Sequence, residues 1–257
     1  MISESDKENV KELLEAKFEA FNSLGFIEND PIQIPHLFEQ KEDIEISAFL
    51  TAIIAWGKRN SIIKNAKKMM SIMGDSPHDF VMNHSPSDLQ DLKFVHRTFQ
   101  SEDLIYFIKT LRSIYAHSNL ENEFSQHIHL GMKENLSRFH ASFLSYEPAQ
   151  RTRKHIANPN KGSSAKRINM FMRWMIRKDN SGVDFGIWDK VSPAQLYCPL
   201  DVHTGNIARK LGLISRKAND WKSLEELMSY LREFDPTDPV KYDFALFGMG
   251  VKNPLAD

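Results

Sequence analysis

The sequence predicts an all-α protein. Apolar residues recur at intervals of three and four along nearly the whole chain, which is the spacing of one face of a helix. We find no run of β-branched residues alternating with polar ones, no repeat and no low-complexity segment. With 257 residues, of which 41% are hydrophobic and 26% charged, the chain has the composition of a globular protein with a substantial core.

A first helix is expected over residues 6–24, where the apolar side chains follow this spacing: Val10, Leu13, Leu14, Phe18 and Phe21. Pro31 and Pro35 then mark a loop. The next apolar run leads into Trp56 and predicts a buried helix over residues 46–54. The pattern resumes over residues 62–70 after a break near Gly57.

Two short helices are expected next. A polar cap residue followed by a proline predicts the start of each, at Ser76-Pro77 and at Ser85-Pro86. The helical spacing predicts the remaining helices over residues 101–117, 121–146, 164–178, 203–212, 220–234 and 238–247. Two stretches, residues 158–164 and 180–199, are irregular. Long loops in a compact helical protein are often functional, so these two stretches indicate where a site could lie.

We expect one helical unit over residues 1–257, with possible lobes formed by 1–45 plus 214–257 and by 46–213. No apolar run is long enough to span a membrane, and the acidic, amphipathic N-terminus lacks the features of a signal peptide. The one cysteine, Cys198, can form neither an internal disulfide nor a four-cysteine iron–sulfur cluster or zinc site. These features predict a cytoplasmic protein without a cofactor, a metal or a membrane partner.

The charges are distributed unevenly although the net charge is only −1. Residues 1–50 contain twelve acidic and four basic residues, whereas residues 151–178 contain nine basic residues and no acidic one. Residues 57–68 add five basic residues, again without an acidic one. Such asymmetry favours a face that binds a polyanion, and the alternative is a solvated surface.

The first segment that could carry chemistry is RKHIANPNKGSSAKRINMFMRWMIRK, residues 153–178. A loop is expected to turn into a helix near Ser163 or Ser164, with Lys166 and Arg167 in the first turn. Backbone N–H groups of the turn at residues 161–164 could then bind a phosphate. Cations in a first helical turn are unfavourable for the helix dipole, and a bound phosphate would compensate for them.

The second segment is PLDVHTGNIARKLGL, residues 199–213. Asp201 stands immediately before an expected helix, and its structural interpretation is an N-cap of that helix. Packing or a surface hydrogen bond is the corresponding interpretation of His203. Gly212 fits the C-terminal end of the same helix.

This second segment resembles the pattern VDxHxxRVxxRLGL of the helix-hairpin-helix DNA glycosylases, which include endonuclease III and the 8-oxoguanine glycosylases. Asp201 falls on the aspartate that nearly all members share as a catalytic residue, and Asn206 stands where an arginine is usual. The whole chain also resembles a bacterial family of conserved hypothetical proteins of unknown function, most clearly in KRINMFMRWMIR and PLDVHTG.

Upstream, GSSAKRI resembles the hairpin motif GxGxKTA and places Lys166 on the catalytic lysine of the bifunctional glycosylases. Lys166 and Asp201 lie 35 residues apart, about twice the usual separation, and the archaeal 8-oxoguanine glycosylases likewise have a longer connection. Further upstream, SAFLTAIIAWGKRNSIIKNAKKM resembles the early helix pair of the family, usually LxAxxLSxQxT, with the DNA-facing Gln and Thr replaced around residues 57–60.

The resemblance implies a DNA-repair glycosylase that acts on double-stranded DNA containing a damaged base. The bifunctional members of the family, whose catalytic lysine Lys166 matches, also have lyase activity toward abasic sites. Lys166 would form a Schiff base with the sugar, and Asp201 would stabilise the positive charge that develops at C1′. The residues expected to contact DNA are Lys58, Arg59, Lys161, Gly162, Ser163, Ser164, Arg167 and His203. Trp56, Phe171, Trp174 and Trp188 could line a pocket for the extruded base, although helical spacing also fits Phe171 and Trp174 as core residues.

Two other functions fit parts of the sequence. A DNA- or RNA-binding protein without catalysis would explain the basic segments equally well and would leave Asp201 as a helix cap. A metal-dependent phosphohydrolase is suggested by His78-Asp79, but no pair of histidines has the helical spacing of metal ligands.

Overall fold

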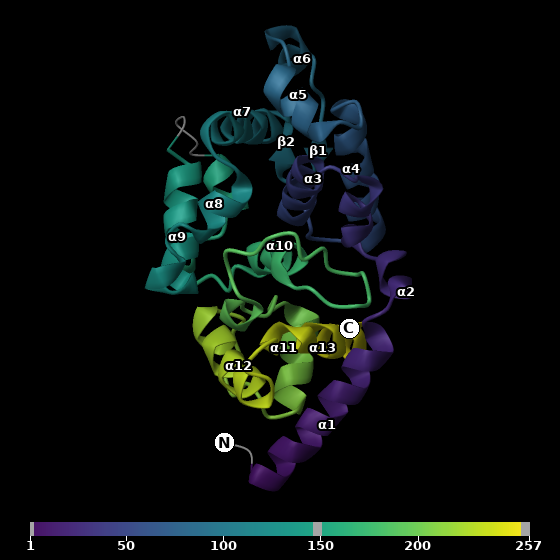
Figure 1. The fold of residues 1–257 in the computed structure, drawn as a ribbon, viewed down its shortest axis with the longest axis vertical. Coiled ribbons are helices and arrows are strands. Elements are labelled where there is room, and N and C mark those ends of the chain that lie inside the picture. Colours follow the sequence, from purple (N-terminus) through teal and green to yellow (C-terminus); the bar gives the residue numbers. More distant parts are fainter. Residues whose placement is uncertain (1–2, 146–150, 253–257) are drawn as a thin grey trace. The chain divides into compact units, whose positions relative to one another are not determined.

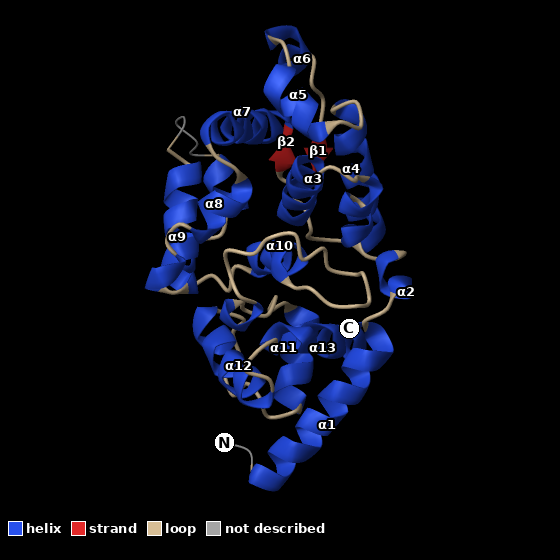
Figure 2. Cartoon of the chain, in the orientation of Figure 1, coloured by secondary structure: helices blue, strands red, loops and turns tan. Residues whose placement is uncertain are grey.

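The computed structural model describes residues 3–145 and 151–252, and within them the secondary structure is helical apart from one short hairpin, with loops joining the helices (Figures 1 and 2). The all-α prediction is therefore confirmed. The hairpin pairs strand β1 (Val95–His96) with strand β2 (Phe99–Gln100) in antiparallel orientation. In the described part of the chain, no helix combines the length and the apolar character that crossing a bilayer requires.

The chain forms two compact units. We call Met1–Phe26 together with Asn158–Asp257 the terminal unit, and Ile27–Ala157 the central unit. The expected lobes also joined the two chain ends, but they divided the chain after residues 45 and 213. In the structure, residues 158–213 belong with the chain ends. Both the lysine and the aspartate singled out in the sequence are thus in the terminal unit.

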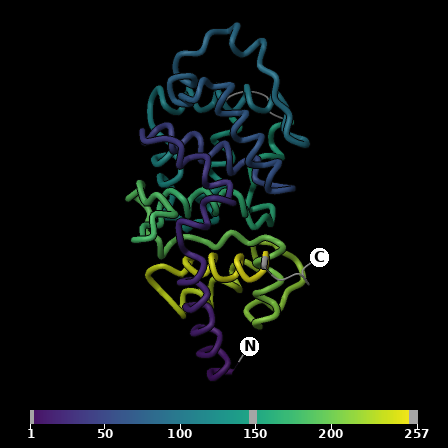
Figure 3. Tube along the Cα trace, turned by 90° about the vertical axis from the view of Figure 1, so that its right-hand side faces the viewer, coloured from purple at the N-terminus to yellow at the C-terminus, as the bar shows by residue number. Residues whose placement is uncertain are grey.

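The terminal unit is built around helix α13, which is alongside α1 and α11 (Figures 1 and 3). Gly248 and Gly250 of α13 permit this close packing: a Cβ atom at Gly248 would lie 2.3 Å from Cδ2 of Phe21, and one at Gly250 would lie 2.8 Å from Cβ of His203. The helices of this unit are α1 (Glu4–Phe21), α2 (Leu24–Ile27, at the unit boundary), α10 (Lys166–Ile176), α11 (Val202–Lys210), α12 (Trp221–Phe234) and α13 (Tyr242–Lys252), with 3-10 turns η5 (Pro159–Lys161), η6 (Pro193–Gln195) and η7 (Pro239–Lys241).

The central unit contains the remaining helices around an aromatic core. They are α3 (Lys41–Ile53), α4 (Arg59–Ile72), α5 (Pro77–Asn83), α6 (Pro86–Gln90), α7 (Ser101–His117), α8 (Leu120–Ser125) and α9 (Met132–Phe143), with 3-10 turns η1 (Pro31–Gln33), η2 (Pro35–Leu37), η3 (Ile128–Leu130) and η4 (Thr152–His155). Phe49 of α3 is fully buried and its ring contacts aromatic rings of α7, α8 and α9, namely Phe107, Phe124, Phe139 and Phe143.

Most expected helices are present, with ends displaced by a few residues. The helix predicted over residues 101–117 coincides with α7, and the loop at Pro31 and Pro35 forms the turns η1 and η2. The helix predicted over residues 121–146 is instead divided into α8 and α9, and residue 146 lies outside the described residues. Gly131 lies at this division with φ 85° and ψ 155°.

The serine caps differ from each other. Ser85 forms a capping box with Asp88 at the start of α6, as its position before a proline predicts. Ser76 stands before Pro77 at the start of α5, but its side chain makes no capping hydrogen bond. The amide of the next residue, His78, donates to Oδ1 of Asp43 at 2.8 Å. A tertiary contact from α3 therefore supports the start of α5.

Replacing Gly131 with alanine is expected to lower the free energy of unfolding by about 1–3 kcal/mol, because glycine alone adopts this backbone region without strain. No atom lies within 4 Å of the position that the new Cβ would take, so the cost comes from the backbone. Gly25→Ala is the control, since its φ is not positive and its Cβ would lie 3.8 Å from the nearest atom, Oγ of Ser23. Urea denaturation measures both variants, and an equal loss in the two would contradict the assignment.

Candidate functional site

The segment before α10 is anchored to the start of α12. The side chain of Asn158 accepts a hydrogen bond from the amide of Asn160 at 2.9 Å and begins the turn η5. Gly162 ends this turn in the left-handed region, with φ 88°. Its carbonyl oxygen accepts a hydrogen bond from the amide of Trp221 at 2.9 Å, and Ser163 forms an isolated β-bridge with Asp220. These contacts fix the position from which α10 starts.

Helix α10 begins at Lys166, two to three residues later than the sequence indicates. Ala165 precedes it with φ 50°, an uncommon conformation for a residue other than glycine. No side chain caps the first turn of α10, which contains Lys166 and Arg167 as expected and no acidic residue. Burial lowers the pKa of Arg167 to about 10, so its guanidinium remains charged at neutral pH.

The amides expected to bind phosphate in the turn at residues 161–164 are partly engaged within the chain. The amide of Lys161 donates to the carbonyl oxygen of Asn158 at 3.1 Å, and that of Gly162 donates to the carbonyl oxygen of Pro159 at 2.9 Å. This part of the expectation is wrong, because the segment closes a 3-10 turn whose own geometry uses these donors. The first turn of α10, which has no side-chain cap, is the better candidate for an anion.

Asp201 is the N-cap of α11, as the structural interpretation of this residue predicts. Its Oδ1 atom accepts a hydrogen bond from the amide of Thr204 at 2.9 Å, and its carbonyl oxygen accepts one from Nδ2 of Asn219 at 2.9 Å. At the other end of α11, Gly212 has φ 74°, and the amide of Leu213 donates to the carbonyl oxygen of Ala208 at 2.8 Å. This is a Schellman motif with the glycine at the position expected for it.

Lys166 and Asp201 meet in space although 35 residues separate them in the sequence. Nζ of Lys166 lies 3.8 Å from Oδ2 of Asp201, the carboxylate oxygen that does not cap α11. A hydrogen bond of 3.4 Å from Oγ of Ser164 to the carbonyl oxygen of Leu200 links the two segments. The lysine side chain is 26% exposed and that of the aspartate 20%, so both remain accessible.

An amine beside a carboxylate at a solvent-accessible surface can perform two kinds of chemistry. The amine can act as a nucleophile toward an electrophilic carbon, and the carboxylate can accept a proton or stabilise a developing positive charge. One carboxylate oxygen of Asp201 fixes the helix while the other faces the amine. The cap therefore orients the group that the chemistry would use.

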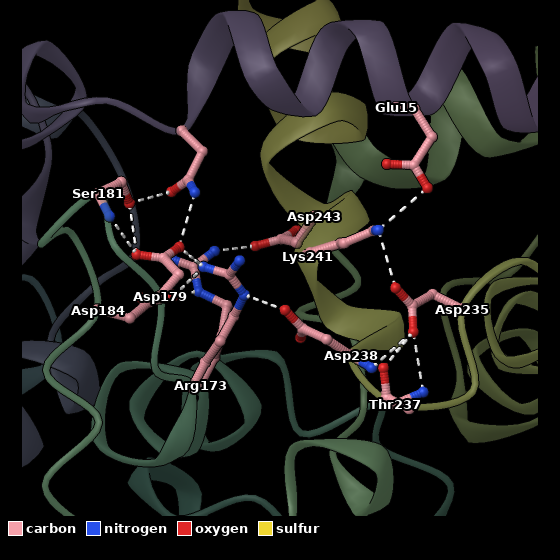
Figure 4. A network of polar contacts seen from close by, with 12 residues as sticks. Glu15, Arg173, Asp179, Ser181, Asp184, Asp235, Thr237, Asp238, Lys241 and Asp243 are labelled. Atoms are coloured by element: carbon pink, nitrogen blue, oxygen red, sulfur yellow. Dashed lines mark hydrogen bonds and ion pairs between the residues drawn. The ribbon is translucent and has the colours of Figure 1, made fainter.

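A buried cluster of arginines and aspartates is in the same unit, with Arg173 and Asp243 among its members (Figure 4). The guanidinium of Arg173 forms an ion pair with Asp243 through Nη1, and its Nε lies 3.3 Å from Oδ1 of Asp184. The thiol of Cys198 donates to Oδ1 of Asp243 at 3.5 Å. The sequence analysis did not predict this cluster, because its members are spread over residues 173–243 and no local spacing indicates that they come together.

Asp243 connects the cluster electrostatically to the candidate site. Burial raises the pKa of Asp243 to about 6, opposed by Arg173, and the carboxylate of Asp201 raises it further while Lys166 acts against it. The pKa of the Cys198 thiol is also raised, by burial and by Asp243, which leaves this cysteine a protonated and buried group. Such a thiol is chemically inert.

The other expected DNA-binding residues of the terminal unit differ in exposure. Lys161, Gly162 and Ser163 are exposed, and Ser164 is buried. His203 is half-buried, its ring lies edge-on to Phe247, and its Nδ1 atom is buried without a hydrogen-bond partner. The exposed residues thus form one short surface next to the start of α10.

Lys58 and Arg59 belong to the central unit, where they stand at the start of α4. Lys58 is exposed and Arg59 is half-buried. Trp56, just before them, is also half-buried. These three residues are therefore neighbours on the surface of the central unit.

The remaining aromatic residues expected at a base pocket lie in the core of the terminal unit. Phe171 and Trp174 are fully buried, and Trp188 is 3% exposed. The rings of Phe171 and Trp188 pack edge to face, with centroids 5.2 Å apart. The burial of Phe171 and Trp174 supports the alternative that helical spacing had indicated, in which these rings stabilise the helix packing. Trp188 was expected at the pocket without that alternative, and its burial in the same core contradicts the expectation.

The pair His78-Asp79, which had suggested a metal-dependent phosphohydrolase, makes ordinary structural contacts. The ring of His78 packs against that of Tyr115 at 5.3 Å, and Asp79 accepts a hydrogen bond from Nδ2 of Asn83 at 2.7 Å. Over residues 3–145 and 151–252, no group of three or more histidine, cysteine or carboxylate side chains could hold a metal ion.

Comparison with known proteins identifies one family. A family model described as protein of unknown function (DUF2400) matches residues 30–252. No curated protein and no solved structure matches the chain.

The raised pKa of Asp243 is expected to make the free energy of unfolding depend on pH. Its pKa is raised from 3.8 to about 6 in the folded state, so its contribution to stability is fully present below pH 4 and is lost as the pH rises through 6. The free energy of unfolding of the wild type minus that of Asp243→Asn should therefore fall by roughly 2 kcal/mol between pH 4 and pH 7.

Asp179→Asn is the control for this measurement. Hydrogen bonds from Ser181 and Asn22 outweigh the effect of burial and lower the pKa of Asp179 to about 2, so its contribution is constant above pH 4. Urea titrations at several pH values give both differences. A difference for Asp243→Asn that stays constant from pH 4 to pH 7 would contradict the raised pKa.

Proposed function

The chain belongs to the DUF2400 family, and from the geometry of its site we propose that it is a DNA-repair glycosylase that also cleaves the strand by a lyase reaction. The observation that carries the proposal is the distance of 3.8 Å between Nζ of Lys166 and Oδ2 of Asp201. These are the residues that the hairpin and aspartate motifs place in the catalytic roles. Two motifs 35 residues apart have no local reason to come together.

In the proposed reaction, the neutral amine of Lys166 attacks C1′ of the damaged nucleotide. The bond from C1′ to the base breaks, and the base leaves with the electron pair and takes up a proton from water. Asp201 stabilises the positive charge that develops at C1′ and accepts the proton released by the amine. Asp201 then passes this proton to the ring oxygen O4′, the C1′–O4′ bond breaks, and a Schiff base forms between lysine and sugar. β-Elimination removes a proton from C2′, breaks the C3′–O bond and releases the 3′ phosphate.

The surface around the pair favours an anionic polymer. Residues 158–178 of the terminal unit contain six basic and no acidic residues, and two of the six, Arg173 and Arg177, are buried in ion pairs. Lys161, Gly162 and Ser163 are exposed beside the start of α10. The first turn of α10 has no side-chain cap, and a phosphate there would compensate for two cations at the positive end of the helix dipole. Contacts of this kind hold DNA in register without reading its sequence.

A second function is supported by the capping hydrogen bond of Asp201 to the amide of Thr204. If that bond is the whole role of Asp201, the protein binds DNA or RNA on the same helices without catalysis. In both functions Oδ1 of Asp201 caps α11. Oδ2 takes part in a reaction only in the glycosylase. Substitutions that keep the cap and change the charge separate them.

Lys166→Gln is expected to abolish covalent trapping. Borohydride reduces a Schiff base to a stable amine, so wild-type protein incubated with a panel of duplexes containing damaged bases should yield a protein–DNA adduct. Lys222→Gln is the control, since Lys222 is an exposed lysine of the same unit that lies outside the basic segment, and its adduct should match that of the wild type. An adduct that persists in Lys166→Gln would show that another amine reacts.

Asp201→Asn should lose base release while keeping most of its stability, because the amide oxygen can still cap α11. Asp201→Ala should lose base release and, in addition, about 1 kcal/mol of stability. Asn119→Ala removes a comparable cap, the bond from the amide of Asn122 to Oδ1 at the start of α8, and should lose stability alone. Base release that survives in Asp201→Asn would favour the non-catalytic protein.

A further inference from the structure

Trp56 differs from the other tryptophans of the chain in being accessible. Trp174, Trp188 and Trp221 are at most 3% exposed, whereas Trp56 is half-buried in the middle of the segment between α3 and α4. A tryptophan whose role is only to fill the core is expected to be buried like the other three. The difference indicates that part of this indole is available to a partner.

The indole of Trp56 is held in a fixed orientation. It stacks on the ring of His155, with centroids 5.8 Å apart and planes at 27°, and the ring of His96 meets it edge-on at 5.1 Å. Nε2 of His96 lies 3.1 Å from the carbonyl oxygen of Trp56. A rigid aromatic ring loses little conformational entropy when another ring stacks on it.

The His155 ring, on which Trp56 stacks, lies next to a buried carboxylate. Nε2 of His155, itself 2% exposed, lies 3.3 Å from Oδ2 of Asp103, which is fully buried. Asp103 accepts hydrogen bonds from Oγ1 of Thr152 at 2.9 Å and from Nε of Arg151 at 3.3 Å. The His155 ring on which Trp56 stacks is thus next to a buried carboxylate that other polar side chains hold in place.

Three cations are close to Trp56 in the chain or contact the residue after it. Lys58 occupies the cap position of α4 and Arg59 its first residue, with no side-chain cap and no acidic residue in the first turn. The guanidinium of Arg97 packs over Gly57, with Nη1 2.7 Å from the position that a Cβ would take there. Gly57 has φ 101°, so this approach requires a glycine both for its backbone and for the space.

We propose that Trp56 stacks on an unpaired nucleobase, with Lys58 and Arg97 contacting the adjoining phosphates of the same strand. An aromatic ring next to cations and to the start of a helix matches the two parts of a nucleotide, the base and the phosphate. A solvated surface would explain the cations but not the oriented, accessible indole. This inference goes beyond the proposed function, because stacking at Trp56 does not depend on any reaction at Lys166.

The first experiment compares two strands with the same phosphates. Fluorescence anisotropy gives the affinity for a labelled oligothymidylate of about twelve nucleotides and for an equally long strand of abasic residues. Trp56→Leu should weaken binding of the thymidine strand roughly tenfold and leave binding of the abasic strand unchanged. Trp56→Phe keeps an aromatic ring and should retain most of the difference between the strands.

The charge contacts are tested with a matched pair of lysines. Lys58→Gln should weaken binding of both strands alike and make the dependence of affinity on salt shallower by about one unit in a log–log plot. Lys68→Gln removes the same charge from an exposed position near the other end of α4 and should have the smaller effect. Equal effects of the two lysines would overturn the placement of the phosphate.

A second measurement uses the unaltered protein, so it does not depend on the folding of a variant. Iodide should quench the fluorescence of Trp56 and spare the three buried tryptophans, and the thymidine strand should protect Trp56 from iodide more than the abasic strand does. Equal protection by the two strands, or a Trp56→Leu variant that still prefers the thymidine strand, would overturn the proposal.

The failure of this inference can be distinguished from failure of the glycosylase proposal. Lys166→Gln should show the same preference for the thymidine strand as the wild type. If no lesion duplex is trapped while that preference holds, the glycosylase proposal alone fails. If trapping succeeds while the two strands bind equally, stacking at Trp56 alone fails.

Discussion

Arg173 of α10 and Arg177, the C-cap residue of the same helix, connect the parts of the terminal unit through buried ion pairs. Arg173 forms ion pairs with Asp184 and with Asp243 of α13. Nε of Arg177 lies 2.8 Å from Oδ2 of Asp238, the residue just before η7. The two guanidinium groups also lie over the ring of Phe244, at 4.3 and 5.3 Å from its centroid. Removing one partner of such a pair leaves a charge that is buried and unpaired, which costs about 3–5 kcal/mol.

These ion pairs explain how α10 can form although its first turn has locally unfavourable charges and backbone geometry. Two cations stand at the positive end of the helix dipole, after an alanine in the left-handed region and without a side-chain cap. The far half of the helix is fixed by its ion pairs, and the near end by the contacts of Gly162 and Ser163 with the start of α12. Tertiary structure thus holds Lys166 beside Asp201 against the preference of the local sequence, as is common at functional sites.

The starts of α10 and α4 share this composition. Each has two cations at or next to its first residue, no acidic residue in the first turn and no side-chain cap, and each belongs to an acid-free segment. Most other long helices begin with an acidic residue in the first turn or with a capping side chain, as α1, α7 and α12 do. A phosphate at each start would supply the missing negative charge, so one kind of ligand accounts for two separate local exceptions.

The sequence by itself determined the helical class, most helix positions, the cap at Asp201 and the glycine that ends α11, because periodicity and capping depend on residues a few positions apart. Only the tertiary structure decided that Gly131 divides a long helix, that α10 starts at Lys166, and that residues 158–213 pack with the chain ends. It also decided which aromatic rings are core and which, like Trp56, are accessible. The distance from Lys166 to Asp201 and the buried cluster at Asp243 likewise depend on contacts between distant segments, which no local pattern encodes.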